Sequence, residues 1–189
     1  RCLVGSEMCI RDRLDEIYAT LGRAVKLNKS LLLLSRIENG QYTEMEDVSV
    51  DEILDELLPD LMDIYEHKQV RLIRKREEQP FIIRCNHSLA QILVSNLVKN
   101  SLLHNREGGE LQVFTTPASL VIRNTGDAPL DGEKLFRRFY HGMDGKKDST
   151  GLGLAIARSI ALSSSLKLTY EWQDGMHTFR LVKESKIYC

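Results

Sequence analysis

Hydrophobic residues recur every three or four positions over residues 14–38, with polar residues between them. This spacing predicts one long helix with an apolar stripe close to a heptad repeat. Asn39 and Gly40 should end it, because glycine readily takes the left-handed conformation that closes helices. The polar stretch 41–47 that follows predicts a linker, with a domain boundary near residue 45.

Beyond residue 47, short apolar runs alternate with longer amphipathic stretches. The pattern predicts strands at 48–50, 70–74, 81–85, 111–116, 120–124, 166–172 and 178–182, and helices at 51–67, 86–105 and 151–163. Asn86 suits the N-cap of the middle helix, and Pro59 is expected to kink the first. Strands outnumber helices and hairpins dominate, which favours an α+β fold whose mixed sheet carries helices on one face.

Composition narrows the class of protein. The 189 residues are 42% hydrophobic and 28% charged, typical of a soluble globular domain with at most a short appendage. Twenty-six Lys and Arg against 27 Asp and Glu give a net charge of -1, which argues against a protein whose main work is binding nucleic acid. The longest aliphatic run, residues 31–34, is far too short to span a membrane. Four cysteines without a C-x-x-C pair indicate reduced thiols in a cytoplasmic protein.

The beginning of the chain is unusual. It opens with Arg1 and not with Met, so we interpret it as a piece of a longer protein. Residues 1–13 fit no predicted element, and our hypothesis is that they are a non-native tail, left out of the fold prediction. Residues 184–189 are expected to form a C-terminal tail.

Three polar side chains on the predicted helix 86–105 carry the first chemical signal. Asn96, Asn100 and His104 are spaced i, i+4 and i+8, so they lie on one face of an otherwise apolar helix. An amide oxygen is a hard, neutral ligand that suits Mg²⁺ already bound to nucleotide phosphates. The alternative is an ordinary polar face turned to solvent.

Two glycine-containing segments follow. Asn124-Thr125-Gly126 ends a predicted strand, where an amide followed by glycine can bring backbone close to a flat ligand; most such sequences are simple turns. Gly151 and Gly153 open the last predicted helix, and their backbone N–H groups would form an anion site there. This segment is not a phosphate loop of the G-x-x-x-x-G-K type, and a glycine-rich helix start is the alternative.

Between the two glycine segments lies a basic and aromatic stretch. Phe136, Phe139 and His141 stand in a polar region, where aromatic residues commonly anchor a loop to the core. Four cations of this stretch, Arg137, Arg138, Lys146 and Lys147, could reach phosphate oxygens. The alternative is a solvated basic surface.

In this order, the four motifs resemble the catalytic ATP-binding domain of sensor histidine kinases, which belongs with the gyrase, Hsp90 and MutL ATPases. Residues 96–104 resemble the asparagine box, 124–126 the first glycine box, 136–140 the phenylalanine box and 151–154 the second glycine box. Residues 32–40 resemble the end of the second helix of the dimerisation and phosphotransfer hairpin. The resemblance covers about residues 14–183. It implies an incomplete hairpin at 14–40 and a Bergerat-type two-layer α/β sandwich at 45–183, with a mostly antiparallel mixed sheet.

The resemblance also implies roles for individual residues. Asn100 would chelate the Mg²⁺ bound to ATP, and Asn96 beside it would help position the reacting groups. Asn124 would recognise the adenine amine, and Arg138 would contact phosphate. The remaining expected ATP contacts are Leu103, His104, Gly126, Phe136, Phe139, Thr150, Gly151, Leu152, Gly153 and Leu154.

The implied function is transfer of the ATP γ-phosphoryl group to a histidine and then to an aspartate on the receiver domain of a response regulator. None of the five histidines lies before the linker, so we expect the acceptor helix to belong to the longer parent, and this chain not to phosphorylate itself. The implied partners are ATP, that acceptor helix, the receiver domain and a second copy in the homodimeric parent, with no nucleic acid. The parent is expected to be anchored in a bacterial inner membrane with this part in the cytoplasm.

Three departures from the family pattern leave an alternative open. Asn124 replaces the usual aspartate, which should cost about tenfold in affinity because a charge-assisted hydrogen bond is lost. Ala128 or Pro129 stands near the second glycine of the first glycine box, and Leu103 stands where many relatives have a cation. A catalytically degenerate nucleotide-sensing module, acting by lid order and dimer geometry, is therefore the second hypothesis. An ATP-driven clamp fits less well because Asn96 occupies the position of its hydrolytic glutamate, and an anti-sigma kinase lacks the helix at 32–38.

Overall fold

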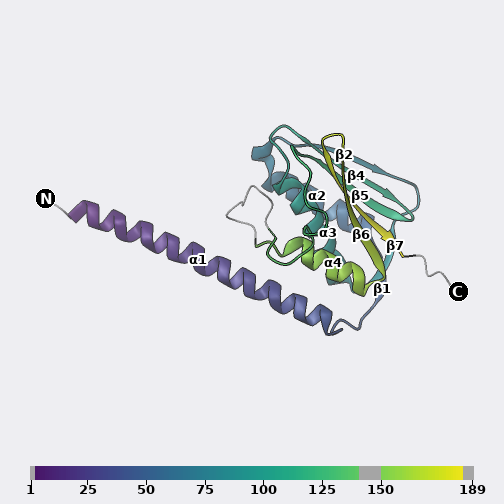
Figure 1. The fold of residues 1–189 in the computed structure, drawn as a ribbon, viewed down its shortest axis with the longest axis horizontal. Coiled ribbons are helices and arrows are strands. Elements are labelled where there is room, and N and C mark those ends of the chain that lie inside the picture. The colour runs from purple at the N-terminus through teal and green to yellow at the C-terminus, as the bar shows by residue number, and fades with distance from the viewer. Residues whose placement is uncertain (1–2, 141–149, 185–189) are drawn as a thin grey trace.

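A single long helix projects from a two-layer α/β body. The structure, a computed structural model, describes residues 3–140 and 150–184, with side chains described from Arg13 onward. Helix α1, Leu3–Glu38, extends away from the body and contacts it only near its C-terminal end (Figure 1). The helix begins at Leu3 and not at Leu14 as predicted, since residues 3–13 continue the same backbone conformation. That residues 1–13 are non-native stays a prediction. Within the described residues, no helix combines the length and the apolar character that a membrane crossing needs.

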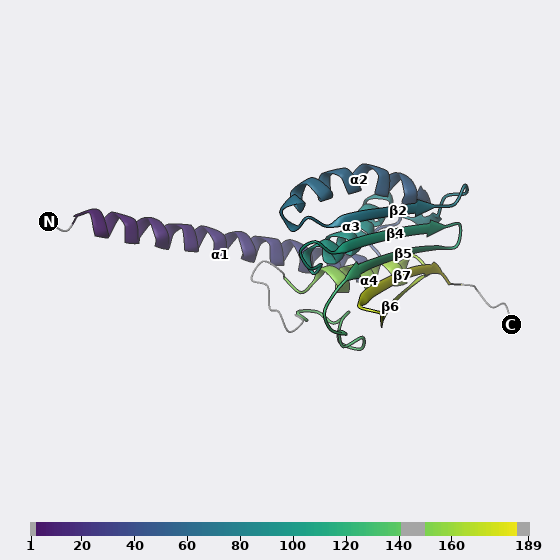
Figure 2. The same ribbon diagram turned by 90° about the horizontal axis from the view of Figure 1, so that it is seen from above.

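The main sheet has five strands in the order β2-β4-β5-β7-β6 (Figure 2). They are β2 Arg71–Arg76, β4 Glu110–Thr116, β5 Ser119–Thr125, β7 Met176–Lys183 and β6 Leu166–Gln173. Only β2 and β4 pair in parallel, and the other neighbours are antiparallel. The predicted α+β fold with a mixed, mostly antiparallel sheet is confirmed.

A second, two-stranded sheet joins β1, Glu46–Ser49, to β3, Ile82–Cys85. The predicted strands at 70–74 and 81–85 are both present, but they do not pair with each other. Strand β3 pairs with β1 instead, and Ile83 and Cys85 on β3 are buried in the core. The predicted linker therefore ends at Glu46, where β1 begins.

Three helices cover one face of the main sheet: α2 Val50–Ile64, α3 His87–Leu103 and α4 Gly153–Ser163. Strands β4, β5 and β7 turn alternate side chains toward them, which places Val113, Ile122 and Phe179 in the core. Pro59 lies inside α2 without ending it. Hydrophobic burial between the two layers therefore holds the helices in place.

Both ends of α3 are fixed by polar contacts. At its N-terminus the Asn86 side chain accepts a hydrogen bond from the Leu89 N–H at 3.3 Å, as the sequence predicted. At its C-terminus Lys68, from the short 3₁₀ helix η1 Glu66–Lys68, donates to the carbonyls of Leu102, Leu103 and Asn105. A cation at this end also complements the helix dipole.

A buried polar network ties α2 to the sheets. The Asp51 carboxylate accepts hydrogen bonds from Arg74 Nη2 at 2.5 Å, Thr115 Oγ1 at 2.5 Å and the Phe81 N–H at 2.9 Å. Burial alone would raise the pKa of Asp51, but these three donors outweigh it and hold the pKa below its ordinary value.

Candidate active site

The amide stripe of α3 lies against the start of α4. Asn96 and Asn100 are half-buried on α3, and the His104 N–H closes its last turn on the Asn100 carbonyl at 3.0 Å. A Cβ atom added to Gly153 would lie 3.4 Å from Asn96 Oδ1, an ordinary van der Waals contact, so the start of α4 lies beside this amide. The first and last of the sequence motifs therefore meet in space.

The second glycine segment also contacts the aromatic stretch. Gly151 has a φ of +65°, and its carbonyl accepts a hydrogen bond from the Phe139 N–H at 3.0 Å. Helix α4 begins at Gly153, two residues later than predicted, with Leu152 as an N-cap whose side chain makes no capping hydrogen bond. The side chains of Leu152 and Leu154 are buried, so these two residues can meet a ligand only through their backbone.

Asn124 points toward the helices. Its side chain is 1% exposed and lies on the same face of β5 as Leu120 and Ile122. One amide hydrogen is donated to the Thr125 carbonyl at 3.2 Å. The amide group of Asn124 therefore lies near the end of β5, on the face of the sheet against which α3 packs.

Gly126 is enclosed by a histidine that the motif analysis did not include. A Cβ atom added to Gly126 would lie 2.1 Å from Nε2 of His177, so the imidazole of His177 occupies that space. The sequence could have indicated His177, because it alternates with Phe179 and Leu181 along β7 and must therefore face the core. A single histidine in a hairpin strand otherwise gives no signal.

Other side chains of the β6–β7 hairpin surround His177. Its Nδ1 lies 2.9 Å from the Tyr170 hydroxyl, which also accepts the Leu130 N–H at 3.0 Å. The Trp172 ring centroid lies 4.6 Å from that of the imidazole. Burial lowers the pKa of His177, and the charge of Asp127 opposes this in part.

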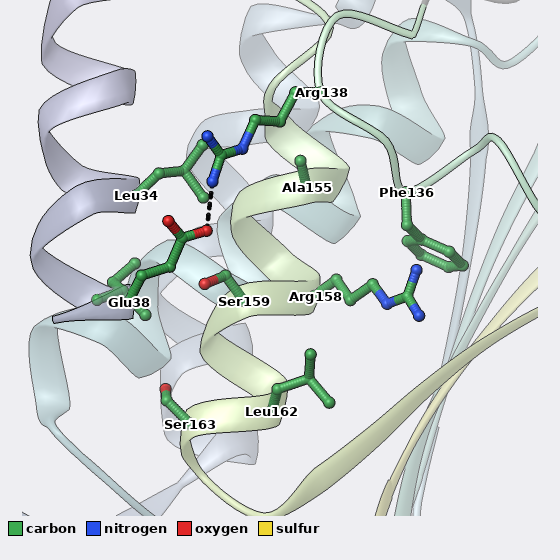
Figure 3. Close-up of a pocket in the computed structure, with 10 residues that line it drawn as sticks. Leu34, Glu38, Phe136, Arg138, Ala155, Arg158, Ser159, Leu162 and Ser163 are labelled. Carbon is green, nitrogen blue, oxygen red and sulfur yellow. Dashed lines mark hydrogen bonds and ion pairs between the residues drawn. The ribbon is translucent and has the colours of Figure 1, made fainter. Parts of the chain in front are cut away.

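Arg138 does not stand free in this structure. It forms an ion pair with Glu38 at the end of α1 (Figure 3). Beside this pair is a cavity of about 390 Å³ between α1, α4 and the aromatic stretch. Phe136 lines the cavity with its ring 5.6 Å from the Arg158 guanidinium carbon, whereas Phe139 is half-exposed. The Arg138 side chain is half-exposed, so it could change partners at low cost.

The site offers amide rather than carboxylate ligands. Among the described residues no group of three or more His, Cys, Asp or Glu side chains could hold a metal ion. Thr150 is half-buried at the edge of the site. Lys146, Lys147 and His141, which belonged to the predicted basic stretch, lie outside the described residues. The amide oxygens of Asn96 and Asn100 fit Mg²⁺ carried by nucleotide phosphates.

Comparison with known proteins points in one direction. Residues 86–184, just over half of the chain, match the family model described as histidine kinase-, DNA gyrase B- and HSP90-like ATPase. The Sensor protein QseC of Salmonella typhi is 29% identical over 175 residues. That match covers 89% of this chain and 38% of QseC, so the chain spans well under half the length of this relative.

Solved structures show the same fold. The histidine kinase AdeS of Acinetobacter baumannii superposes with a TM-score of 0.72 at 17% identity, covering 91% of this chain and 84% of AdeS. The histidine kinase ThkA in complex with the response regulator protein TrrA gives a TM-score of 0.70 at 16% identity, covering 93% of this chain and 52% of ThkA.

Proposed function

The chain belongs to the family of histidine kinase-, DNA gyrase B- and HSP90-like ATPases, and from this premise we propose that it is the catalytic, ATP-binding part of a sensor histidine kinase. The family brings ATP binding with it. The reaction proposed is transfer of the ATP γ-phosphoryl group to a histidine imidazole on a separate helix, and then to an aspartate of a response-regulator receiver domain. The observation that supports it most directly is the meeting of Asn96 with Gly153, which joins the amide stripe to an uncapped helix start.

The phosphate end of the site lies between α3 and α4. The first-turn N–H groups of α4 lack a side-chain cap and can bind phosphate oxygens. Asn100 is proposed to ligate the Mg²⁺ carried by the phosphates, and Asn96 beside it would orient the γ-phosphoryl group. The ion, when bound, neutralises phosphate charge. Phosphoryl transfer needs little covalent chemistry from the protein, so positioning and charge account for the rate.

The adenine end lies at the end of β5. We assign Asn124 to the adenine amine, because its buried side chain lies near the C-terminal end of β5 and faces the helices. Arg138 is proposed to contact phosphate after exchanging its Glu38 partner for the nucleotide. The further contacts proposed from the motif positions are Leu103, His104, Gly126, Phe136, Phe139, Thr150, Gly151, Leu152 and Leu154.

The partners proposed follow from the exposed helix. Four apolar side chains on α1, Leu14, Ile17, Leu21 and Val25, are exposed, as expected of a helix that pairs within a four-helix bundle of two chains. We propose residues 14–40 as the second helix of that bundle and 45–183 as the ATP-binding domain, with residues 184–189 as a tail. The parent would act at the cytoplasmic side of a bacterial inner membrane.

A nucleotide sensor without transfer activity is the second candidate. The amide of Asn124 in place of the family's aspartate, and Leu103 in place of a cation, favour it. Both residues are expected to weaken nucleotide binding without abolishing it, and the similarity to sensor histidine kinases favours the kinase.

Calorimetry of ATP and ADP binding, with and without Mg²⁺, tests the site. The Asn100→Ala variant should lose most of the Mg²⁺-dependent part of ATP affinity, whereas Lys99→Ala, exposed on the same helix, should bind as the wild type does. No binding by the folded wild-type chain at millimolar nucleotide would contradict the function. Radiolabelled ATP with a separately supplied acceptor helix then separates the candidates, since transfer identifies the kinase and binding without transfer the sensor.

A further inference from the structure

We propose that His177 and Gly126 form an interlock that positions residues 124–130 beside the base of the bound nucleotide, which makes His177 a positioning residue of the ATP site. The inference deepens the proposed function and depends on it. It assigns a second reason for glycine at position 126, separate from any contact with the nucleotide.

The first argument is the register of the strands. Asn124 on β5 and His177 on β7 are direct cross-strand partners, and both are buried on the face that packs against the helices. Cross-strand neighbours on one face lie about 4.5–5.5 Å apart at Cβ, so the imidazole lies next to the proposed adenine ligand. A shift of His177 must therefore disturb the end of β5.

The second argument is steric. The imidazole fills the space in which a side chain at position 126 would lie, with the added Cβ only 2.1 Å from Nε2 and 2.4 Å from Cδ2. Real Cβ atoms never approach other atoms so closely. With the His177 ring in the position seen in this structure, only glycine fits at 126.

The third argument is a chain of hydrogen bonds that holds the other end of the segment. The Leu130 N–H donates to the Tyr170 hydroxyl, and that hydroxyl lies 2.9 Å from His177 Nδ1. If the hydroxyl gives its hydrogen to Nδ1, the neutral ring carries its own hydrogen on Nε2, toward Gly126. Gly126 itself donates its N–H to the Gly175 carbonyl at 3.1 Å. The segment is therefore fastened at both ends to the β6–β7 hairpin, while residues 127–129 between them are exposed.

The interlock makes a prediction that separates it from the phosphate contacts. Loosening residues 124–130 disturbs the adenine end only, so ATP and ADP should lose affinity by the same factor and the Mg²⁺ dependence should not change. A change at Asn100 should instead alter the Mg²⁺ dependence and lower ATP and ADP affinity by different factors.

A double-variant cycle tests the steric part. Gly126→Ala should weaken ADP binding by about tenfold or more, because the methyl group and the imidazole cannot both fit. His177→Ala alone should weaken it by only about three- to tenfold, the range of one lost hydrogen bond. The double variant should return to the level of His177→Ala. A double variant that stays as weak as Gly126→Ala, or is weaker, contradicts the interlock.

Tyr170→Phe tests the hydrogen-bonded part and keeps the inference falsifiable if Gly126→Ala does not fold. It removes one oxygen, and the ring keeps its contact with Phe179, whose centroid lies 5.4 Å away. The Leu130 amide should exchange with solvent faster, and ATP and ADP affinity should fall equally, by about two- to tenfold. Tyr65→Phe, a half-buried tyrosine at the end of α2, is the matched control and should leave both unchanged. Unchanged exchange and affinity in Tyr170→Phe contradict the inference.

The two hypotheses fail in different ways. A folded wild-type chain that binds no nucleotide contradicts the proposed function and, with it, any role of His177 at an ATP site. A wild-type chain that binds nucleotide, combined with a double variant that is not rescued, contradicts the interlock alone.

Discussion

Replacing Asp51 with alanine should destabilise the protein strongly, although Asp51 lies away from the proposed nucleotide contacts. Its carboxylate is 5% exposed and is the common acceptor for Arg74, Thr115 and the Phe81 backbone. These three donors come from β2, β4 and the residue before β3. The substitution therefore removes a buried polar group that joins α2 to both sheets.

The magnitude follows from burial. Breaking a buried ion pair by removing one partner costs about 3–5 kcal/mol, because the remaining charge is left buried and unpaired. The Arg74 side chain is 18% exposed and can recover part of its hydration, which places its share near the lower limit. The unpaired Phe81 N–H adds about 1–3 kcal/mol. We therefore expect a loss of about 4–6 kcal/mol, a large part of the roughly 5–15 kcal/mol that stabilises a typical domain.

Urea unfolding followed by circular dichroism at pH 7 measures this loss. Asp55→Ala is the matched control, because Asp55 lies on the same helix and pairs with Arg76, but both side chains are more than half exposed. Exposed pairs contribute less than about 1 kcal/mol. If the two variants lose similar, small free energies of unfolding, the buried network is not a major source of stability.

The same variant has an acid signature. The folded-state pKa of Asp51 lies below its ordinary value of 3.8, so the stabilisation is fully present above pH 3.8 and is lost as the pH falls through the folded pKa. The difference in unfolding free energy between the wild type and Asp51→Ala should therefore shrink with acidification below pH 3.8. A constant difference would contradict this assignment.

Three further predictions concern the site. Asn124→Asp should bind ATP about tenfold more tightly, since it restores a charge-assisted hydrogen bond, and should unfold more easily because the buried amide donor is lost; unchanged affinity in calorimetry would remove Asn124 from the adenine contact. Glu38→Lys should free Arg138 and raise ATP affinity by up to about fivefold, which corresponds to the free energy of an exposed ion pair. A salt concentration of 1 M should abolish this gain. Equal affinities of the variant and the wild type at low salt would show that Glu38 does not compete with phosphate. Burial lowers the pKa of His177 below 6.5 despite Asp127, so stability should be full above pH 6.5 and fall as the pH drops through the folded pKa; in thermal melts His177→Ala should lack this fall, and an identical profile would contradict the assignment.

The helices and most strand positions could be predicted because their signals are local. Asn86 marks the start of α3 as its N-cap, within one turn of the helix. The alternation of apolar and polar residues along β4 and β5 is visible within the seven residues of each strand. The pairing of strands could not be predicted in the same way. Strands β2 and β4 pair in parallel although α3 lies between them in the sequence, so no tight turn indicates that they are partners.

The candidate site shows the same difference between local and long-range signals. Each of the four motifs is a continuous stretch of sequence, and their order along the chain was enough to suggest a nucleotide site. The Glu38–Arg138 pair joins residues 100 positions apart, and nothing near either residue indicates the other. His177 was missed because its role comes from what lies across the sheet, at Asn124 and Gly126. Contacts of this kind are set by the fold and not by the local pattern.

Helix α1 has the geometry of an unequal lever. Its 36 residues give a length of about 54 Å at about 1.5 Å per residue. Several residues near its C-terminal end pack against the body, and we take Leu34, the most deeply buried of them, as the pivot. The long arm from Leu3 to Leu34 is about eight times the short arm from Leu34 to Glu38. In a rigid helix, a sideways displacement of about 5 Å at the far end would move Glu38 by only about 0.6 Å. This is close to the spread of about 0.5 Å over which N–H···O hydrogen bonds form, so a large movement at a distance would reach Arg138 as the making or breaking of one contact.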